Sequence, residues 1–179
     1  MKNYIPTINI SSLIKNNFNT TRSQQTIKKI EKACIEVGFF QVVGHGINIK
    51  KINNVCKIGN KFFNSSKANK NKLAPKKWNK KNKNLYRGYF PNTVNGKEGL
   101  DLGDLQIKPN NIKKYKSSYI EYLDLTKSLS VSSIKTLSNY FDDIYALSEI
   151  LFKAIIKLYK KDIKISNEAF SRLKTLSTL

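Results

Sequence analysis

The sequence has few of the residues from which most catalytic and metal sites are built. His45 is the single histidine among 179 residues, and Cys34 and Cys56 are the only cysteines. No C-x-x-C pair exists, and neither G-x-x-x-x-G-K-S/T nor G-x-G-x-x-G occurs. These absences exclude the usual zinc, thiol-redox and phosphate-loop motifs, and they leave no second histidine to activate a Ser or Cys nucleophile. Catalysis by this chain alone is therefore not expected.

Long apolar runs are also missing. No window approaches the ~20 consecutive apolar residues that a membrane-spanning helix needs, and Met1–Ile10 lacks the apolar core of a signal peptide. Cys34 and Cys56 fall at apolar positions of two predicted helices, which indicates buried, reduced thiols rather than a disulfide or a metal pair. We therefore predict a cytoplasmic protein that does not enter a membrane.

Acidic residues are scarce. Lys and Arg number 33 against 12 Asp and Glu, which gives a formal net charge of +21 and a pI near 9.9. Such a charge can mark a nucleic-acid or other polyanion partner, which would bind the segment Lys67–Arg87 with Trp78 as a stacking platform. Lys, Asn and Ile are frequent in every part of the chain, however, as expected of an AT-rich coding sequence. We favour this compositional explanation and predict a short helix followed by a solvated loop over Lys67–Lys83.

The residues that are present predict a packed α+β fold, mostly helical, that starts in the order β, α, β, α. Hydrophobic residues make up 40% of the sequence and aromatic residues 11%. Ile5–Ile10 predicts a short strand, Thr20–Val37 a helix ended by Gly38, Val37–Gly46 a buried strand, and Ile49–Phe63 a second helix. Their periodicity predicts the buried helix faces: Ile27, Ile30, Cys34 and Val37 in the first, and Ile49, Ile52, Cys56, Gly59 and Phe63 in the second.

The second half of the sequence predicts one more strand and further helices. Leu85–Pro91 is a short aromatic strand, followed by a turn and a loop that includes Asp101. Helices are expected over Ile112–Leu129 and, as a long amphipathic helix, over Ser132–Lys160, with a last turn or two near residues 166–173. We divide the chain into an N-terminal domain, residues 1–110, and a helical segment, residues 111–179.

Five motifs occur in an order that resembles a known family. They are Ile5–Ile10 ("IPxIDL"), Cys34–Ile47 ("C-x-x-x-G-F-F-Q-V-x-x-H-G-I", with Gly44 where Asn is more usual), Phe62–Phe63 ("FF"), Tyr86–Tyr89 ("YRGY") and Lys97–Asp101 ("KExLD"). The ordered set resembles the N-terminal region of the isopenicillin N synthase-like, non-haem Fe(II)/2-oxoglutarate-dependent dioxygenases. The resemblance implies that Gly38, Phe39, Phe40, His45 and Gly46 form a structural signature rather than a catalytic site.

The resemblance also implies that the catalytic machinery lies elsewhere. In the family, iron is bound by an H-x-D motif and a distant His, and 2-oxoglutarate by an R-x-S motif, all within a downstream jelly-roll barrel. A site of two histidines and one carboxylate cannot be built with His45 alone. Leu176–Leu179 resembles the segment that precedes the first barrel strand. We therefore expect a truncated oxidoreductase chain that binds neither Fe(II) nor 2-oxoglutarate, is inactive alone, and has strands that would join an absent barrel, which a separately encoded partner could supply.

Arg87 and Tyr89 are the candidate substrate-pocket contacts of a complete enzyme, because the resembling segment can approach the pocket in the family. The alternative is that Tyr89 and Phe90 belong to the core and Arg87 to a surface ion pair. Glu98 and Asp101 are expected to be solvated charges in a loop rather than paired catalytic carboxylates.

Two other functions stay open for the chain. One is a basic module that binds nucleic acid or another polyanion, and the other is a non-catalytic scaffold subunit.

Overall fold

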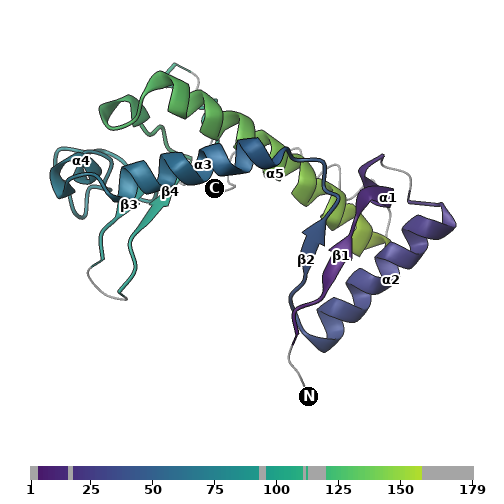
Figure 1. Cartoon of the computed structure of the whole chain (residues 1–179). Coiled ribbons are helices and arrows are strands. Elements are labelled where there is room, and N and C mark those ends of the chain that lie inside the picture. Colours follow the sequence, from purple (N-terminus) through teal and green to yellow (C-terminus); the bar gives the residue numbers. More distant parts are fainter. Residues whose placement is uncertain (1–3, 16–17, 93–95, 111, 113–119, 159–179) are drawn as a thin grey trace. The chain divides into compact units, whose positions relative to one another are not determined.

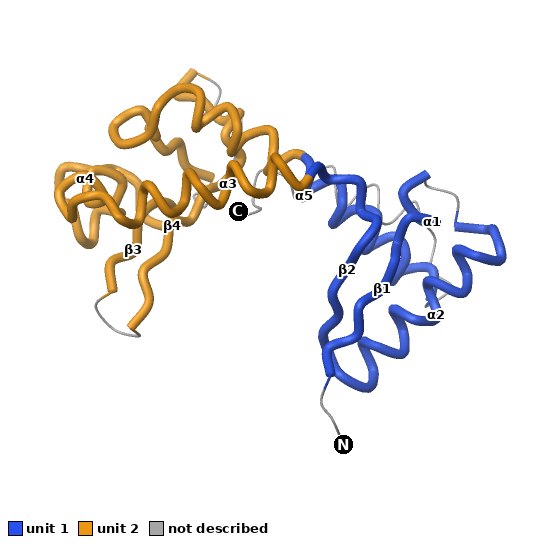
Figure 2. The backbone as a smooth tube through the Cα atoms, viewed as in Figure 1, with its two compact units in different colours: residues 1–48, 143–171 blue, residues 49–142, 172–179 orange. Residues whose placement is uncertain are grey.

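A computed structural model describes residues 4–15, 18–92, 96–110, 112 and 120–158. The chain forms two compact units, which are coloured separately in Figure 2. Of the described residues, unit 1 contains those up to 48 and those from 143 to 158, and unit 2 contains those from 49 to 142. Each unit is described by itself below. The predicted division at residue 110 stays a prediction.

Unit 1 is a β-α-β arrangement with a second helical layer. Its elements are β1 (Thr7–Asn9), α1 (Ser11–Ile14), α2 (Thr21–Glu36), β2 (Gln41–Val43) and the last part of α5 (Val131–Leu158), as Figure 1 labels them. β1 and β2 pair in parallel with Ile8 opposite Val42, which confirms the predicted β, α, β order. The core gathers Ile8, Ile10, Leu13, Phe18, Ile27, Ile30, Ala33 and Ala154.

The ends of α2 follow the local signals in the sequence. The Thr20 hydroxyl accepts a hydrogen bond from the Ser23 amide at 3.1 Å, as an N-cap does. At the other end, Gly38 has a φ of +82°, and its amide donates to the Ala33 carbonyl at 2.9 Å. Glycine adopts this left-handed conformation without a steric penalty, so it ends the helix where the sequence predicts.

Two burial predictions for unit 1 are wrong. Cys34 is exposed, because the buried face of α2 continues from Ile30 to Ala33. This face also includes Ser23, whose hydroxyl donates to the Ser12 carbonyl at 3.0 Å, so a polar contact helps to select the face. The predicted strand Val37–Gly46 is not buried either: Val37 is 41%, Phe39 71% and Val43 44% exposed, and only Phe40 and Val42 pack on the core.

Unit 2 combines helices with a small antiparallel hairpin. Its elements are α3 (Ile49–Phe63), α4 (Lys67–Asn71), β3 (Gly88–Phe90), β4 (Gly99–Asp101), the 3-10 turn η2 (Leu125–Lys127) and the first part of α5. Within the described residues the sheets are thus two pairs of strands. The core contains Phe62, Leu73, Ala74, Tyr89, Leu102, Leu125 and Leu137.

Several predictions for unit 2 need correction. Cys56 is exposed, because α3 turns Val55, Ile58 and Phe62 toward the core instead. The helix expected over residues 112–129 is wrong where it is described, since residues 120–124 are not helical and only the short turn η2 follows. The long helix is confirmed as α5, which begins at Val131. The turns expected near residues 166–173 lie outside the described residues.

The Asn-rich segment after α4 is packed rather than solvated. Leu73, Ala74 and Pro75 are buried, as are the side chains of Asn82 and Asn84. The Asn82 amide donates to the carbonyls of Lys72 at 3.0 Å and Ala74 at 2.7 Å. A buried amide that satisfies backbone carbonyls substitutes for regular secondary structure, which explains how a polar segment forms an ordered loop here.

Candidate functional site

The segment predicted to approach a substrate lies on the β3–β4 hairpin, and Gly88 determines how that hairpin packs. Gly88 has a φ of +118°, and a Cβ at this position would lie 2.0 Å from the Leu73 carbonyl oxygen. The Tyr89 amide donates to the same oxygen at 3.1 Å. The backbone of β3 therefore touches the backbone of the Asn-rich loop directly, and only glycine fits at this contact.

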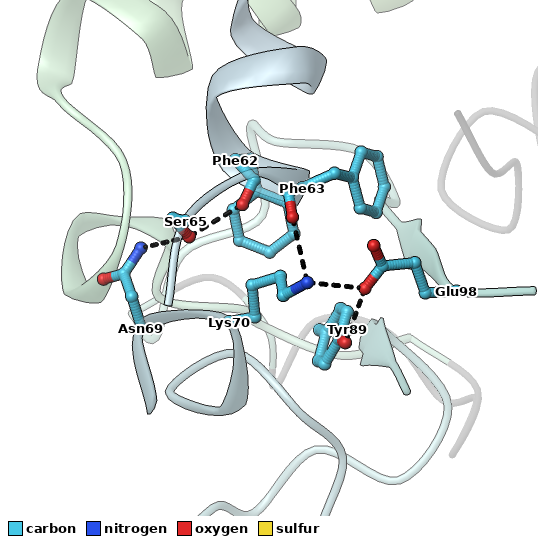
Figure 3. A network of polar contacts seen from close by, with 7 residues as sticks. All are labelled: Phe62, Phe63, Ser65, Asn69, Lys70, Tyr89 and Glu98. Carbon is cyan, nitrogen blue, oxygen red and sulfur yellow. Dashed lines mark hydrogen bonds and ion pairs between the residues drawn. The ribbon is translucent and has the colours of Figure 1, made fainter. Parts of the chain in front are cut away.

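Tyr89 projects from β3 into the core of unit 2, where it is 3% exposed. Its ring meets that of Phe62 edge to face, with 5.9 Å between centroids. Its hydroxyl donates to Glu98 Oε2 at 2.7 Å, so the polar end of the side chain is satisfied (Figure 3). Burial, and next the hydrogen bond to Glu98, raises the pKa of the Tyr89 phenol.

Lys70 of α4 completes a polar cluster with Tyr89 and Glu98. Its ammonium donates to Glu98 Oε2 at 2.7 Å and to the Phe63 carbonyl, at the end of α3, at 2.9 Å (Figure 3). The side chains of Lys70 and Glu98 are only 12% and 31% exposed. The hydrogen bond to Glu98 raises the pKa of Lys70, and the Lys70 contact, followed by that of Tyr89, lowers the pKa of Glu98. The cluster joins α3, α4 and the hairpin.

The prediction of solvated carboxylates in a loop is wrong for Asp101, whereas Glu98 does lie in an exposed loop, just before β4, but is paired there. Glu98 is held by two donors, and Asp101 belongs to β4, opposite Gly88. Burial raises the pKa of Asp101, and the positive charge of Arg87 partly opposes this effect. Neither carboxylate is placed as a partner of the other, since β4 directs Asp101 toward Arg87 and Glu98 bonds to Lys70 and Tyr89.

Arg87 lies at a cavity of about 70 Å³ in unit 2, which Asp104, Glu121 and Tyr122 also line. The Glu121 carboxylate accepts hydrogen bonds from three consecutive amides, those of Leu85, Tyr86 (2.8 Å) and Arg87 (2.9 Å). Three aligned amides form a concave anion site, and here a carboxylate of the same chain fills it. Glu121 thus fixes the backbone from which the Arg87 side chain extends.

The structure separates the two predicted contact residues. Arg87 lines a cavity, whereas Tyr89 is a core residue whose hydroxyl is engaged by Glu98. Their contact with substrate in a complete enzyme stays a prediction. Sequence patterns missed Lys70 and Glu121, because their contacts join residues 28 and 34 to 36 positions apart and no local periodicity encodes such pairs.

The structural signature lies in unit 1. The His45 Nδ1 accepts a hydrogen bond from the Ile47 amide at 3.1 Å, within a turn that includes Gly46, and the ring is partly buried. An accepting Nδ1 places the proton of the neutral imidazole on Nε2. Phe40 packs against the core of unit 1, whereas Phe39 points to solvent. This geometry accounts for His45 as a turn residue.

The described residues offer no donor set that suits iron. Nowhere in residues 4–15, 18–92, 96–110, 112 and 120–158 do three or more His, Cys, Asp or Glu side chains gather as metal ligands would. The sequence, with its single histidine, also lacks the pair of imidazoles that a site of two histidines and one carboxylate uses. The residues present therefore do not fit the family's metal.

Of the helices described, none is long and apolar enough to cross a membrane.

Fold and site together define an α+β region with an aromatic hairpin that depends on a glycine. Comparison with known proteins assigns this region to a family. A family model described as "non-haem dioxygenase in morphine synthesis N-terminal" matches residues 5–132. The chain belongs to this family, the N-terminal domain of the 2-oxoglutarate/Fe(II)-dependent oxygenases. The resemblance inferred from the five motifs is thereby confirmed.

Individual relatives agree with this assignment. A homoarginine-6-hydroxylase of Arabidopsis thaliana is 29% identical over 168 residues, which cover 76% of this chain and 45% of that protein. Jasmonate-induced oxygenase 3 of Arabidopsis thaliana is 30% identical over 161 residues, covering 86% of this chain and 39% of that protein. The chain therefore spans less than half the length of these two relatives.

One solved structure shows the same fold. The crystal structure of C-terminally truncated Neurospora crassa T7H in apo form superposes with a TM-score of 0.66 at 22% sequence identity. The match covers 93% of this chain and 57% of that one. The α+β architecture with small sheets is thus the fold of the N-terminal part of a larger protein.

Proposed function

We propose that this chain serves as the N-terminal, non-metal-binding part of an Fe(II)/2-oxoglutarate oxygenase that acts on a small molecule. The observation that carries the proposal is the family match over residues 5–132 in a chain with one histidine. In complete members of the family, iron and 2-oxoglutarate provide the oxidising chemistry. The residues of this chain then supply structure and pocket surface, and the ligands of iron and 2-oxoglutarate come from a jelly-roll barrel outside these 179 residues.

In this proposal Arg87 is the residue that faces the substrate. Its guanidinium keeps a positive charge at any physiological pH and offers a planar set of donors, which suits an anionic or carbonyl group. Glu121 holds the Arg87 backbone, and Gly88 and Tyr89 fix the strand that follows it. Tyr89 acts through the position of the hairpin rather than by touching the substrate, because its hydroxyl is already bonded to Glu98.

A barrel partner is supported by the exposed side of unit 1. Parallel strands normally have both faces covered, and an isolated pair of three-residue strands is too small to be stable alone. Val43 of β2 and Phe39, which precedes this strand, are exposed, and Ile35 of α2 is 78% exposed. We infer that a barrel, in the same polypeptide or in a separate one, covers this surface in the working enzyme.

Self-association of the purified chain tests this inference. With the apolar surface uncovered, the chain is expected to form concentration-dependent oligomers in sedimentation experiments. The substitution Phe39→Ser should reduce them while changing the unfolding free energy by less than about 0.5 kcal/mol, because the side chain is mostly exposed. Val131→Ser, at an equally exposed apolar residue of unit 2, is the matched control and should leave them unchanged. A wild-type chain that stays monomeric at all concentrations would contradict the proposed barrel-facing surface.

A further inference from the structure

Unit 2 has a second cavity, of about 270 Å³, whose walls are rich in lysine. Lys72, Lys81 and Lys83 come from the Asn-rich loop, and Lys127 comes from the turn η2. This basic pocket adjoins the Arg87 cavity, with which it shares the lining residues Tyr122, Leu123 and Asp124, but Arg87 does not line it. It brings together lysines that lie up to 55 positions apart in the sequence.

The charges around the basic pocket do not balance. Asp124 is the one carboxylate among its lining residues, and its Oδ1 accepts from the Thr126 amide at 3.2 Å and from the Thr126 hydroxyl at 2.6 Å. Among the described residues, no ion pair links Lys72, Lys81 or Lys83 to an acid. A concave surface lined by one sign of charge concentrates the field and attracts counter-ions.

The sequence around the pocket argues against general lysine richness as the whole explanation. No Asp or Glu occurs between Glu36 and Glu98, whereas lysines continue throughout that stretch. An unbiased lysine-rich composition would still distribute acids among them. The loop that carries three of the pocket lysines lies inside this acid-free stretch, so its surplus of positive charge is local.

The wall of the pocket is ordered by buried asparagines. Asn82 is 7% exposed, and its amide bonds to two loop carbonyls while its Oδ1 accepts from the Lys127 ammonium at 3.3 Å. Asn84, also buried, donates to the Arg87 carbonyl. These contacts fix the backbone between Lys81 and Lys83 and place Lys127 beside it. The lysine stems thus extend from a rigid frame, which lowers the entropy lost on ligand binding.

We propose that the basic pocket binds a small, multiply charged oxyanion, such as a phosphate ester or a polycarboxylate. A nucleic acid is the less suitable ligand for two reasons. The lysines surround a hollow rather than a long stripe. In addition, Trp78 does not line the pocket, and its ring packs edge to face on Phe90 with 5.2 Å between centroids, so it is not a free platform for a base.

Calorimetric titration of the full chain with inorganic pyrophosphate and, separately, with citrate tests the proposal. Saturable binding of either probe at about 50 mM salt, weakening steeply as salt is added, is expected. Binding of pyrophosphate alone would identify a phosphate ligand, and binding of citrate alone a polycarboxylate. The double variant Lys81→Gln/Lys83→Gln should weaken binding by about tenfold or more, since each lost ammonium removes a charge-assisted contact.

Lys28→Gln/Lys29→Gln on α2 is the matched control, because it removes the same charge from exposed lysines of unit 1. It should change the affinity less than about twofold, through long-range electrostatics only. Equal weakening by the two double variants would overturn the proposal, as would no binding of either probe at about 50 mM salt. Tighter binding of a single-stranded oligonucleotide than of pyrophosphate would also overturn it, in favour of a nucleic-acid interface. The helical signal in the far-ultraviolet circular dichroism spectrum of each variant checks that the fold is retained.

Discussion

Gly88 is the motif residue whose identity the packing of the structure explains most directly. The motif Tyr86–Tyr89 requires a residue without a side chain between Arg87 and Tyr89, because the Leu73 carbonyl lies against the Gly88 Cα. The positive φ of Gly88 adds a second reason, since other residues rarely adopt it. A substitution here therefore changes the position of both neighbours at once.

Gly88→Ala is expected to lower the unfolding free energy of unit 2 by about 3 kcal/mol, from backbone strain and the clash with Leu73. Urea unfolding followed by the fluorescence of Trp78, the only tryptophan in the sequence, measures this value, because Trp78 packs against the core of unit 2. Gly59→Ala in α3 is the matched control. Its Cβ would meet nothing within 4 Å, so it should stabilise the helix by about 0.5–1 kcal/mol. Equal effects of the two substitutions would contradict this account of Gly88.

The Lys70–Glu98–Tyr89 cluster makes the stability of unit 2 depend on pH. The pKa of Glu98 is lower in the folded chain than its ordinary 4.5, so the folded state binds the proton less tightly than the unfolded state does. Its contribution is complete above pH 4.5 and is lost as the pH falls through the folded pKa. The pKa values of Lys70 and Tyr89 are raised from 10.5 and 10.0, so their contributions are lost as the pH rises above this range.

Glu98→Gln should therefore destabilise the chain at pH 7, and the difference from wild type should shrink as the pH falls below 4.5. Urea unfolding at several pH values, followed by circular dichroism, measures the difference. Glu149→Gln on α5 is the control, because it removes an ion pair to Lys153 of similar length, 2.8 Å, that lacks a tyrosine donor. A Glu98→Gln difference that stays constant down to pH 3 would show that the charge of Glu98 does not stabilise the hairpin.

At the scale of elements, the segment of residues 85–87 that leads into β3 depends on an acceptor far along the chain. Glu121→Gln replaces a charged acceptor of three amides with a neutral one, and charge-assisted hydrogen bonds are roughly twice as strong. The amides of Leu85, Tyr86 and Arg87 should then exchange with solvent about tenfold faster. Hydrogen-exchange NMR measures this rate. Glu31→Gln in unit 1 should leave the three amides unchanged, and unchanged rates in Glu121→Gln itself would contradict the role of Glu121.

Elements with strong local signals were predictable from the sequence. The hydroxyl of Thr20 and the conformational freedom of Gly38 place the two ends of α2, and a continuous apolar periodicity places α5. Burial was less predictable, because the face of α2 is chosen partly by the contact of Ser23 with Ser12 in another element. The helix expected over residues 112–129 is not formed at residues 120–124, where the Glu121 carboxylate instead accepts hydrogen bonds from the amides before β3.

The candidate site was predictable only as a segment. The motif pointed to Arg87 and Tyr89, but their different positions, one at a cavity and one in the core, depend on contacts with Leu73, Glu98 and Glu121. These partners lie between 9 and 34 positions away. No periodicity of a helix or a strand relates residues at such separations, so a single sequence without its fold does not indicate them.

At the scale of the whole molecule, the proposed function assigns structure and pocket surface to this chain and the ligands of iron to another region. The chain belongs to the N-terminal family of the 2-oxoglutarate/Fe(II) oxygenases and spans less than half the length of the two relatives described. Its described residues provide a glycine-dependent hairpin, an arginine cavity and a basic pocket, but no set of ligands that suits iron. We therefore propose, as the central claim, that residues outside these 179 hold the metal and 2-oxoglutarate.

Titration of the chain with Mn(II), a redox-stable substitute for Fe(II), tests this claim most directly. Electron paramagnetic resonance of free Mn(II), recorded with and without 2-oxoglutarate, distinguishes a true site from weak surface binding. We expect no saturable tight site and no strengthening of metal binding by 2-oxoglutarate. One tight Mn(II) site per chain whose affinity rises with 2-oxoglutarate would contradict it.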